Sequence, residues 1–334
     1  MMRYLSLALL ASLIAAVVGS GSSRSTNITM TKYNALFGFG DSMTETGNIC
    51  LGSNSTELDA LTCTHPPYGM TYFGKPSCRW CNGRVVIDFT AQALGFPLLP
   101  PLKSQGKDFR RGANMAITGD CKEFLKKSLF QFGGFGGNDY NVQLLELALT
   151  VQQGMKNTPM IINAIVNGVE RLIALGARQI VVPGIHPTGC LPLFLSLFAS
   201  SSNEADLDQY GCMRSYNRLT EYHNTMLQKQ VEILQRKHRS ARIMYADYYQ
   251  LYYQMVQQPQ KFGFSNPFEA CCGAGGGKYN FDITKRCGMP GATIACRDPS
   301  ARLSWDGIHP SEAANKFISD GWLHGPYCTP PILG

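Results

Sequence analysis

The stretch LFGFGDSMTETGN (Leu36–Asn48) joins an apolar segment to a polar turn. The apolar run NALFGF, residues 34–39, predicts a short buried strand, and Gly38 within it indicates that another element approaches closely. The triplet Gly-Asp-Ser, which ends at Ser42, follows at the point where the strand ends. Such a serine is either a helix cap or a nucleophile, and the triplet alone favours the cap.

Helical and strand-like patterns alternate downstream of this stretch. Apolar residues recur at helical spacing in three segments, residues 85–94, 160–175 and 219–238. Two runs that are typical of strands, QIVVPG (179–184) and ARIMYAD (241–247), follow the second and third of these segments. This alternation is typical of a mostly parallel sheet covered by helices. Because no internal repeat or linker divides the chain, we expect one α/β domain.

Two long segments, residues 50–82 and 251–296, are predicted to be irregular loops rich in cysteine and glycine. The 12 cysteines indicate disulfides if the chain is secreted. The CRWC motif (78–81) has no second cysteine pair or nearby histidine, so we do not expect a zinc site. The adjacent Cys271 and Cys272 are expected to bond to separate partners, because a disulfide between neighbours is strained.

The N-terminus has the pattern of a secretory signal peptide. Arg3 precedes an apolar run over residues 5–18 and then small residues, which predicts a signal peptide over residues 1–20 and secretion. Asn27 and Asn54 lie in Asn-x-Ser/Thr sequons and are candidate glycosylation sites. No later segment holds 18 unbroken apolar residues, so we expect no stable membrane insertion.

The formal net charge of +7 comes from scattered basic residues. None of them forms a run like a nucleic-acid-binding arm, so we expect no nucleic-acid partner. A solvated surface is the simpler interpretation, and weak attraction to an acidic polymer is the alternative.

The segment SWDGIHP places Asp306 three residues before His309. Pro310 keeps His309 out of a helical conformation. In a tight turn, this spacing lets the carboxylate accept a hydrogen bond from one ring nitrogen. The other nitrogen is then free to take a proton from Ser42.

The segment FGGFGGNDYN supplies a candidate oxyanion donor, Asn138. A plain glycine–asparagine turn is the alternative interpretation. Gly-x-Ser-x-Gly and HExxH are absent, which argues against a nucleophile elbow and a zinc hydrolase. The run CCGAGGGKYN lacks the Gly-Lys-Ser/Thr ending of a phosphate loop, and we expect no metal or organic cofactor.

Taken together and in this order, the Gly-Asp-Ser, Gly-Gly-Asn-Asp and Asp-x-x-His motifs resemble the GDSL esterase/lipase family of SGNH hydrolases. The segments NGVERLIALGARQIVVPGIHPTGCLP (167–192) and ACCGAGGGKYNF (270–281) resemble its plant branch. The resemblance implies a flavodoxin-like three-layer α/β/α sandwich with a mostly parallel sheet.

The resemblance also implies a role for each motif residue. Ser42 matches the nucleophile, His309 the base and Asp306 the acid that orients the base. The oxyanion hole would consist of the Ser42 backbone N–H, Gly119 and the Asn138 side chain. Gly119 lies in GANMAITG, the remaining family motif.

Two features depart from the family pattern. Met43 replaces the leucine of the family name, a swap that conserves volume. Plant members also carry some tens of residues between the segments that match ITG and SLF. Here DCKEFLKK alone separates them. We therefore expect one hydrolase domain over residues 30–328 that lacks a segment after Gly119.

The expected function is a secreted serine esterase that favours short acyl groups, acetyl above all, and the resemblance to the plant branch implies that it is secreted to the apoplast or cell wall. Its substrate would be a small-molecule or cell-wall polysaccharide ester, and the protein is expected to be a monomer. The sequence leaves three alternatives open: an acyltransferase with the same acyl-enzyme, a lipase, and a non-catalytic wall-binding protein.

Overall fold

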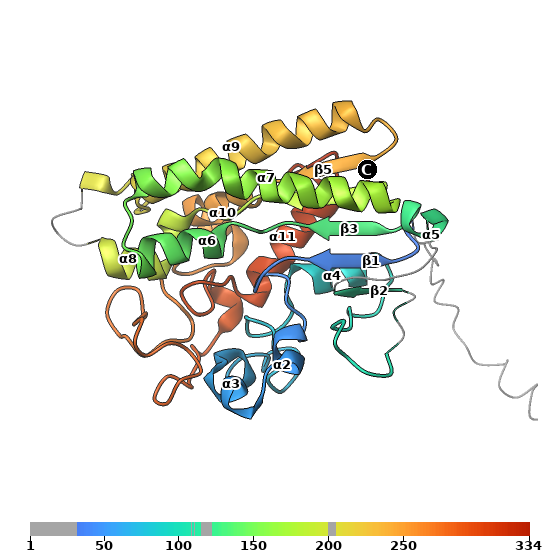
Figure 1. The fold of residues 1–334 in the computed structure, drawn as a ribbon. Coiled ribbons are helices and arrows are strands. Elements are labelled where there is room, and N and C mark those ends of the chain that lie inside the picture. Colours follow the sequence, from blue (N-terminus) through green and yellow to red (C-terminus); the bar gives the residue numbers. More distant parts are fainter. Residues whose placement is uncertain (1–31, 108, 110, 115–121, 200–204) are drawn as a thin grey trace, which may run out of the picture. The chain divides into compact units, whose positions relative to one another are not determined.

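A six-stranded, mostly parallel sheet forms the centre of the unit Lys32–Gly334 (Figure 1). The structure, a computed structural model, describes residues 32–334 except 108, 110, 115–121 and 200–204. The strand order is β2-β1-β3-β4-β5-β6, and only the last pair is antiparallel. The strands are β1 (Leu36–Phe39), β2 (Gly112–Asn114), β3 (Leu129–Phe132), β4 (Gln179–Pro183), β5 (Arg242–Ala246) and β6 (Cys328–Thr329).

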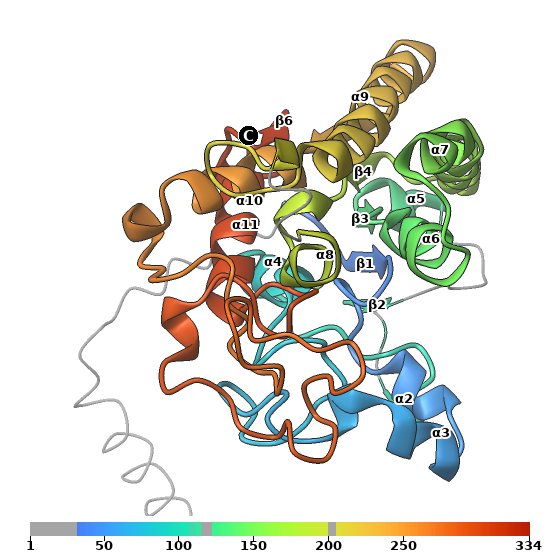
Figure 2. The ribbon, with the colours of Figure 1, turned by 90° about the vertical axis from the view of Figure 1, so that its left-hand side faces the viewer.

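Helices cover both faces of this sheet (Figures 1 and 2). One face carries α7 (Val151–Leu175) and α9 (Arg214–Lys237), which pack against each other. The other face carries α4 (Val86–Ala93) and α11 (Glu312–His324). The predicted three-layer α/β/α fold is therefore confirmed.

Gly38 marks the contact between β1 and α4. A Cβ atom at this position would lie 2.2 Å from the Cδ1 atom of Ile87. The glycine therefore lets α4 lie directly on the strand, as the sequence indicated.

Two of the long helices begin earlier than predicted: α9, at Arg214 instead of residue 219, and α7. α7 begins at Val151 instead of Met160, because Thr150 and Gln153 form a capping box at its start. Pro159 lies inside the helix and obscured the pattern. α7 is long and apolar enough to span a membrane, but its apolar face packs against α9, and its Gly168 lies against Phe132 of β3.

Both predicted loops contain helices that the sequence analysis missed. The first contains α2 (Asn48–Gly52) and α3 (Ser55–Ala60). In the second, the prediction was wrong for its first residues, where α10 (Tyr248–Gln257) packs on α11. Asp247 caps α10 by accepting from the Gln250 N–H. Shorter helical elements of the described residues include α5 (Lys122–Lys126), α6 (Gly137–Asn141), a π-helical turn (Val142–Glu146), α8 (Pro192–Phe198) and 3₁₀ turns at Thr62–Thr64, Thr188–Cys190, Pro259–Phe262 and Pro299–Ala301.

Four disulfides cross-link the described residues. They are Cys50–Cys78, Cys190–Cys212, Cys271–Cys296 and Cys272–Cys287. The adjacent Cys271 and Cys272 thus bond to separate partners, as predicted. In the CRWC motif, Cys78 is disulfide-bonded and Cys81 is a buried thiol. Within the described ranges, no group of three or more His, Cys, Asp or Glu side chains could hold a metal ion.

Candidate active site

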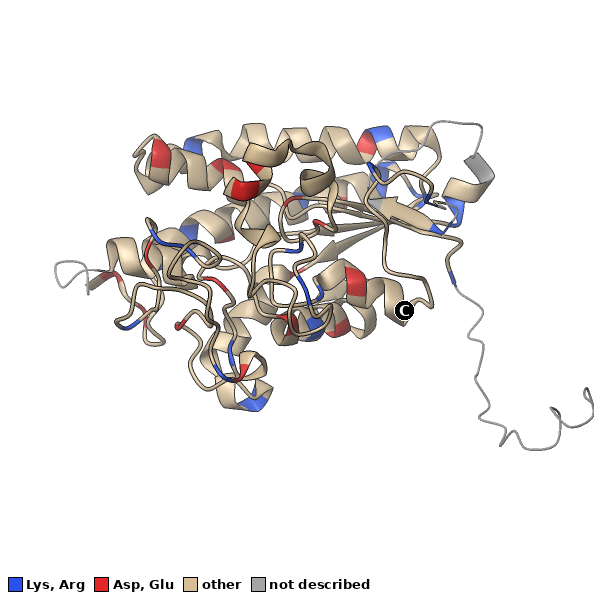
Figure 3. Ribbon diagram, turned by 90° about the horizontal axis from the view of Figure 1, so that it is seen from below, with Lys and Arg blue, Asp and Glu red and all other residues tan. Residues whose placement is uncertain are grey.

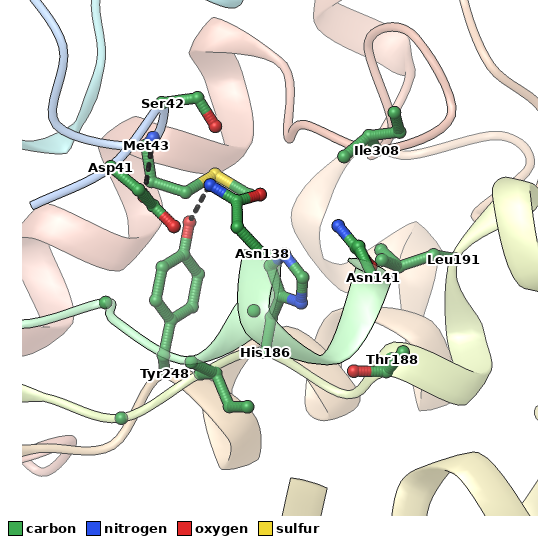
Figure 4. Close-up of a pocket in the computed structure, with 14 residues that line it drawn as sticks. Asp41, Ser42, Met43, Asn138, Asn141, His186, Thr188, Leu191, Tyr248 and Ile308 are labelled. Atoms are coloured by element: carbon green, nitrogen blue, oxygen red, sulfur yellow. Dashed lines mark hydrogen bonds between the residues drawn. The ribbon is translucent and has the colours of Figure 1, made fainter. Parts of the chain in front are cut away.

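The candidate site lies where the carboxyl ends of β1, β3, β4 and β5 meet. The segments that follow these strands carry Ser42, Asn138, His186 and Tyr248, and Figure 4 shows their side chains around one cavity. Carboxyl ends of neighbouring parallel strands share one edge of a sheet, which is where α/β proteins bind ligands. The sheet topology therefore brings together residues that are far apart in the sequence.

Ser42 lies in a tight turn directly after β1. The Thr44 N–H donates to the Asp41 carbonyl at 3.0 Å, and the Met43 N–H donates to Asp41 Oδ1 at 3.0 Å. The next helix begins only at Asn48, so Ser42 is not a helix cap. Its Oγ atom lies 2.8 Å from His309 Nε2 instead.

Asp306 and His309 form the predicted tight turn. The His309 Nδ1 atom lies 2.7 Å from Asp306 Oδ2, and the backbone N–H groups of Ile308 and His309 donate to Oδ1 at 2.9 and 2.8 Å. Gly307, with φ of +92°, supplies the left-handed residue that the turn needs. The structure therefore joins Ser42, His309 and Asp306 in one hydrogen-bonded chain.

Burial and hydrogen bonding shift the pKa values of the acidic residues of the site in opposite directions. Burial would raise the pKa of Asp306, but His309 and the hydrogen bonds from the turn lower it overall. Asp306 is therefore a carboxylate near neutral pH. Burial raises the pKa of Asp41 to about 6.

Two aromatic residues of the site were missed because they lie in the predicted loop 50–82. The Tyr68 hydroxyl donates to Asp306 Oδ2 at 2.8 Å. The Trp80 ring lies over the His309 ring, with centroids 5.4 Å apart. The only signal in the sequence was the presence of these large aromatic residues in a cysteine-rich loop.

Asn138 lies in the first turn of α6 and lines the same cavity as Ser42 (Figure 4). Two residues further on, the Tyr140 hydroxyl is 3.1 Å from His223 Nδ1 and 2.9 Å from Thr158 Oγ1. This buried network fixes α6 against α7 and α9.

The structure describes only one of the three remaining predicted site residues. Gly119 and Asn27 lie outside the described residues. Asn54 is exposed, as a glycosylation site requires, and it is the N-cap of α3.

Comparison with known proteins identifies the family. Residues 36–322 match the family model described as GDSL-like Lipase/Acylhydrolase. The chain belongs to the GDSL esterase/lipase family. It is 35% identical over 344 aligned residues to GDSL esterase/lipase At1g28590 of Arabidopsis thaliana, covering 90% of this chain and 84% of that protein. It is also 35% identical over 359 residues to GDSL esterase/lipase At1g28670 of the same plant, covering 94% and 91%. The protein is thus a carboxylic ester hydrolase.

Two cavities of this esterase meet at Ser42. An inner cavity of about 30 Å³ lies at the strand ends, and an open outer groove of about 580 Å³ lies beside it. Asp41, Ser42, Asn138, Asn141 and Ile308 line both. The inner cavity is otherwise lined by Met43, Gly134, Gly137, Gly184, Ile185, His186, Thr188, Leu191 and Tyr248. The groove is otherwise lined by Gly40, Glu45, Ile49, Trp80, Leu145, Glu146, Leu193, Phe281, Ile283, Arg286 and His309.

Proposed function

We propose that this esterase hydrolyses esters of short acyl groups, acetyl above all, with Ser42 as nucleophile. His309 Nε2 takes the Ser42 proton as Oγ attacks the ester carbonyl, and Asp306 stabilises the imidazolium. The Asn138 amide and the Ser42 N–H donate to the oxyanion. The alcohol leaves with the proton from His309, and water, deprotonated by His309, then hydrolyses the acyl-enzyme.

The position of His309 supports an assignment of the two cavities. A leaving alcohol must lie next to the imidazolium that protonates it. His309 lines the outer groove but not the inner cavity. The alcohol part of the substrate is therefore assigned to the groove, and the acyl part to the inner cavity.

The size of the inner cavity supports a preference for short acyl groups. A volume of about 30 Å³ has room for about two water-sized groups. An acetyl group needs little more, whereas a longer chain would have to displace the buried Leu191. Each added methylene then gains none of the roughly 0.8 kcal/mol that burial would otherwise supply.

The groove does not favour a wall polysaccharide over a small-molecule ester. Apolar side chains, with Trp80 and Phe281 the largest, share its walls with the charged Glu45, Glu146 and Arg286. Charge does not favour an acidic polymer either, because Figure 3 shows basic and acidic residues interspersed along the same helices and loops.

The test is the acyl-chain dependence of kcat/KM for p-nitrophenyl acetate, butyrate, octanoate and palmitate. We expect the value to fall with chain length, and Leu191→Ala to raise the butyrate-to-acetate ratio about tenfold by enlarging the inner cavity. Loss of fluorophosphonate labelling in Ser42→Ala would assign the nucleophile. A kcat/KM value that climbs steadily to palmitate would contradict the proposal and favour a lipase.

An acyltransferase is the second candidate, because the open groove gives a second alcohol the same access to the acyl-enzyme as water. Product analysis with added alcohol acceptors separates the two. An acyl ester of the acceptor would identify transfer, and free acid alone would identify hydrolysis.

We also propose that the protein is secreted after removal of residues 1–20. Four disulfides are compatible with an oxidising compartment. N-terminal sequencing and glycosidase treatment of protein recovered from the medium test cleavage and the sequon at Asn54. An intracellular, uncleaved chain would contradict this.

A further inference from the structure

Tyr68 makes a direct hydrogen bond to the proposed triad. Its hydroxyl donates to Asp306 Oδ2 at 2.8 Å, the same oxygen that accepts from His309 Nδ1 at 2.7 Å. The other carboxylate oxygen is held by two backbone N–H groups of the turn. Four donors therefore surround one buried carboxylate, and Tyr68 supplies the only side-chain donor other than His309 among the hydrogen bonds described for it.

We propose that Tyr68 is a positioning residue that sets how strongly Asp306 holds the proton of His309. This rests on the proposed function of Ser42, His309 and Asp306. The Tyr68 hydroxyl and the imidazolium compete for charge on one oxygen. A donor at that oxygen weakens the attraction between Asp306 and the imidazolium. His309 then releases its proton at lower pH and is available as a base in more acidic solution.

The surroundings of Tyr68 fix this donor in place. The ring is 1% exposed and packs edge-on against Trp305 and Trp80, with centroids 5.7 and 6.2 Å away. Burial and the charge of Asp306 raise the pKa of the Tyr68 hydroxyl well above its usual value, so it remains a donor throughout the working range. Tyr68→Phe keeps the ring and removes only the hydroxyl.

No other titratable side chain described near the triad donates to Asp306 as Tyr68 does, apart from His309 itself. Cys63 and Tyr252 face Asp306 and stay protonated, because burial raises both pKa values. His186 faces His309 and stays neutral above pH 5, because burial lowers its pKa to about 4. Asp41, whose pKa burial raises to about 6, has no described hydrogen bond to Tyr68 and is present in both wild type and variant.

The experiment measures the rate of labelling by a fluorophosphonate probe from pH 5 to 9. Ser42 Oγ displaces fluoride from phosphorus while His309 takes the hydroxyl proton, so the rate reports the base without requiring the natural ester. In Tyr68→Phe we expect the midpoint of the acidic limb to move up by about half a pH unit, with labelling at low pH about threefold slower.

Tyr33→Phe is the matched control. Tyr33 is equally buried and its hydroxyl donates to the Ile332 carbonyl at 2.7 Å, and neither residue is among the described hydrogen-bond partners of Asp306. We expect it to lower the melting temperature without moving the midpoint. An unmoved midpoint in Tyr68→Phe, or an equal shift in Tyr33→Phe, would overturn the inference alone. Labelling that persists in Ser42→Ala would refute the proposed function, and the inference with it.

Discussion

Ser42 and Asn138 are held by the sheet, whereas Asp306 and His309 are held by a cross-linked loop. β1 and β3 are adjacent, with Phe39 opposite Phe132, and the two candidate residues follow these strands closely. The turn of Asp306 instead follows a segment whose carbonyl groups accept hydrogen bonds from a disulfide-linked region. Cys271 donates to the Ser304 carbonyl at 3.1 Å, and Cys272 to the Trp305 carbonyl at 2.8 Å.

Different interactions therefore hold the two halves of the site, the sheet-held half with Ser42 and Asn138 and the loop-held half with Asp306 and His309. Packing of apolar strands and helices fixes the first half, while disulfides and backbone hydrogen bonds fix the second. The hydrogen bond between Ser42 and His309 joins the two halves. A variant that weakens only the packing or only the disulfides should therefore affect one half of the site more than the other.

Removing one residue from each half gives the largest expected effect. Ser42→Ala should lower kcat for p-nitrophenyl acetate by roughly 10³ to 10⁶, and His309→Ala by a similar factor, because triad members act as a unit. The double variant should lose little more than either single variant. Additive losses would show that the two halves do not share one step.

Asn138→Ala tests the sheet-held half alone. We expect kcat to fall by about 10² to 10³ with KM unchanged, because an oxyanion donor acts mainly in the transition state. Steady-state kinetics on p-nitrophenyl acetate measures both values. A higher KM with kcat preserved would instead make Asn138 a substrate-binding residue.

Removing the Cys271–Cys296 disulfide with serines tests the loop-held half. It should lower stability by about 3 kcal/mol and slow fluorophosphonate labelling about tenfold, as the Asp306 turn loosens. The matched control is the Cys190–Cys212 pair, which closes a loop of similar length. Its removal should cost similar stability with a smaller loss of labelling, and equal slowing would contradict the comparison.

Lowering the pH from 7 to 4 should destabilise mainly the sheet-held half of the site. Burial lowers the pKa values of His186 and His223 to about 4, so their contribution to stability is present above about pH 6.5 and is lost as pH falls through 4. Asp41, with a pKa raised to about 6, opposes part of this loss.

His223→Gln removes one titrating group and keeps an acceptor for the Tyr140 hydroxyl. We expect it to reduce the fall in unfolding free energy between pH 7 and 4 by about 1 to 3 kcal/mol. Urea unfolding at several pH values measures this. An unchanged pH dependence would assign the loss to other groups.

The two halves also differ in how far the sequence predicted them. Strand and helix periods predicted the layers and placed Ser42 at a strand end, because local periodicity reflects burial on one face. The spacing of Asp306 and His309 predicted their turn. Tyr68 could not be predicted, because its contact with Asp306 depends on how a loop without periodicity folds. The absent period also hid α10, whose buried face is built largely from tyrosines.

The contact between the Trp80 and His309 rings, which are tilted by 31° to each other, gives the protein a candidate optical reporter. The chain has three tryptophans, and Trp305 and Trp322 are almost fully buried, whereas Trp80 is only partly buried. A protonated imidazole quenches the fluorescence of an indole that it contacts, and a neutral imidazole quenches it far less. We therefore expect emission from Trp80 to respond when His309, the proposed base, gains or loses its proton, which would make that change readable in the resting protein without any substrate.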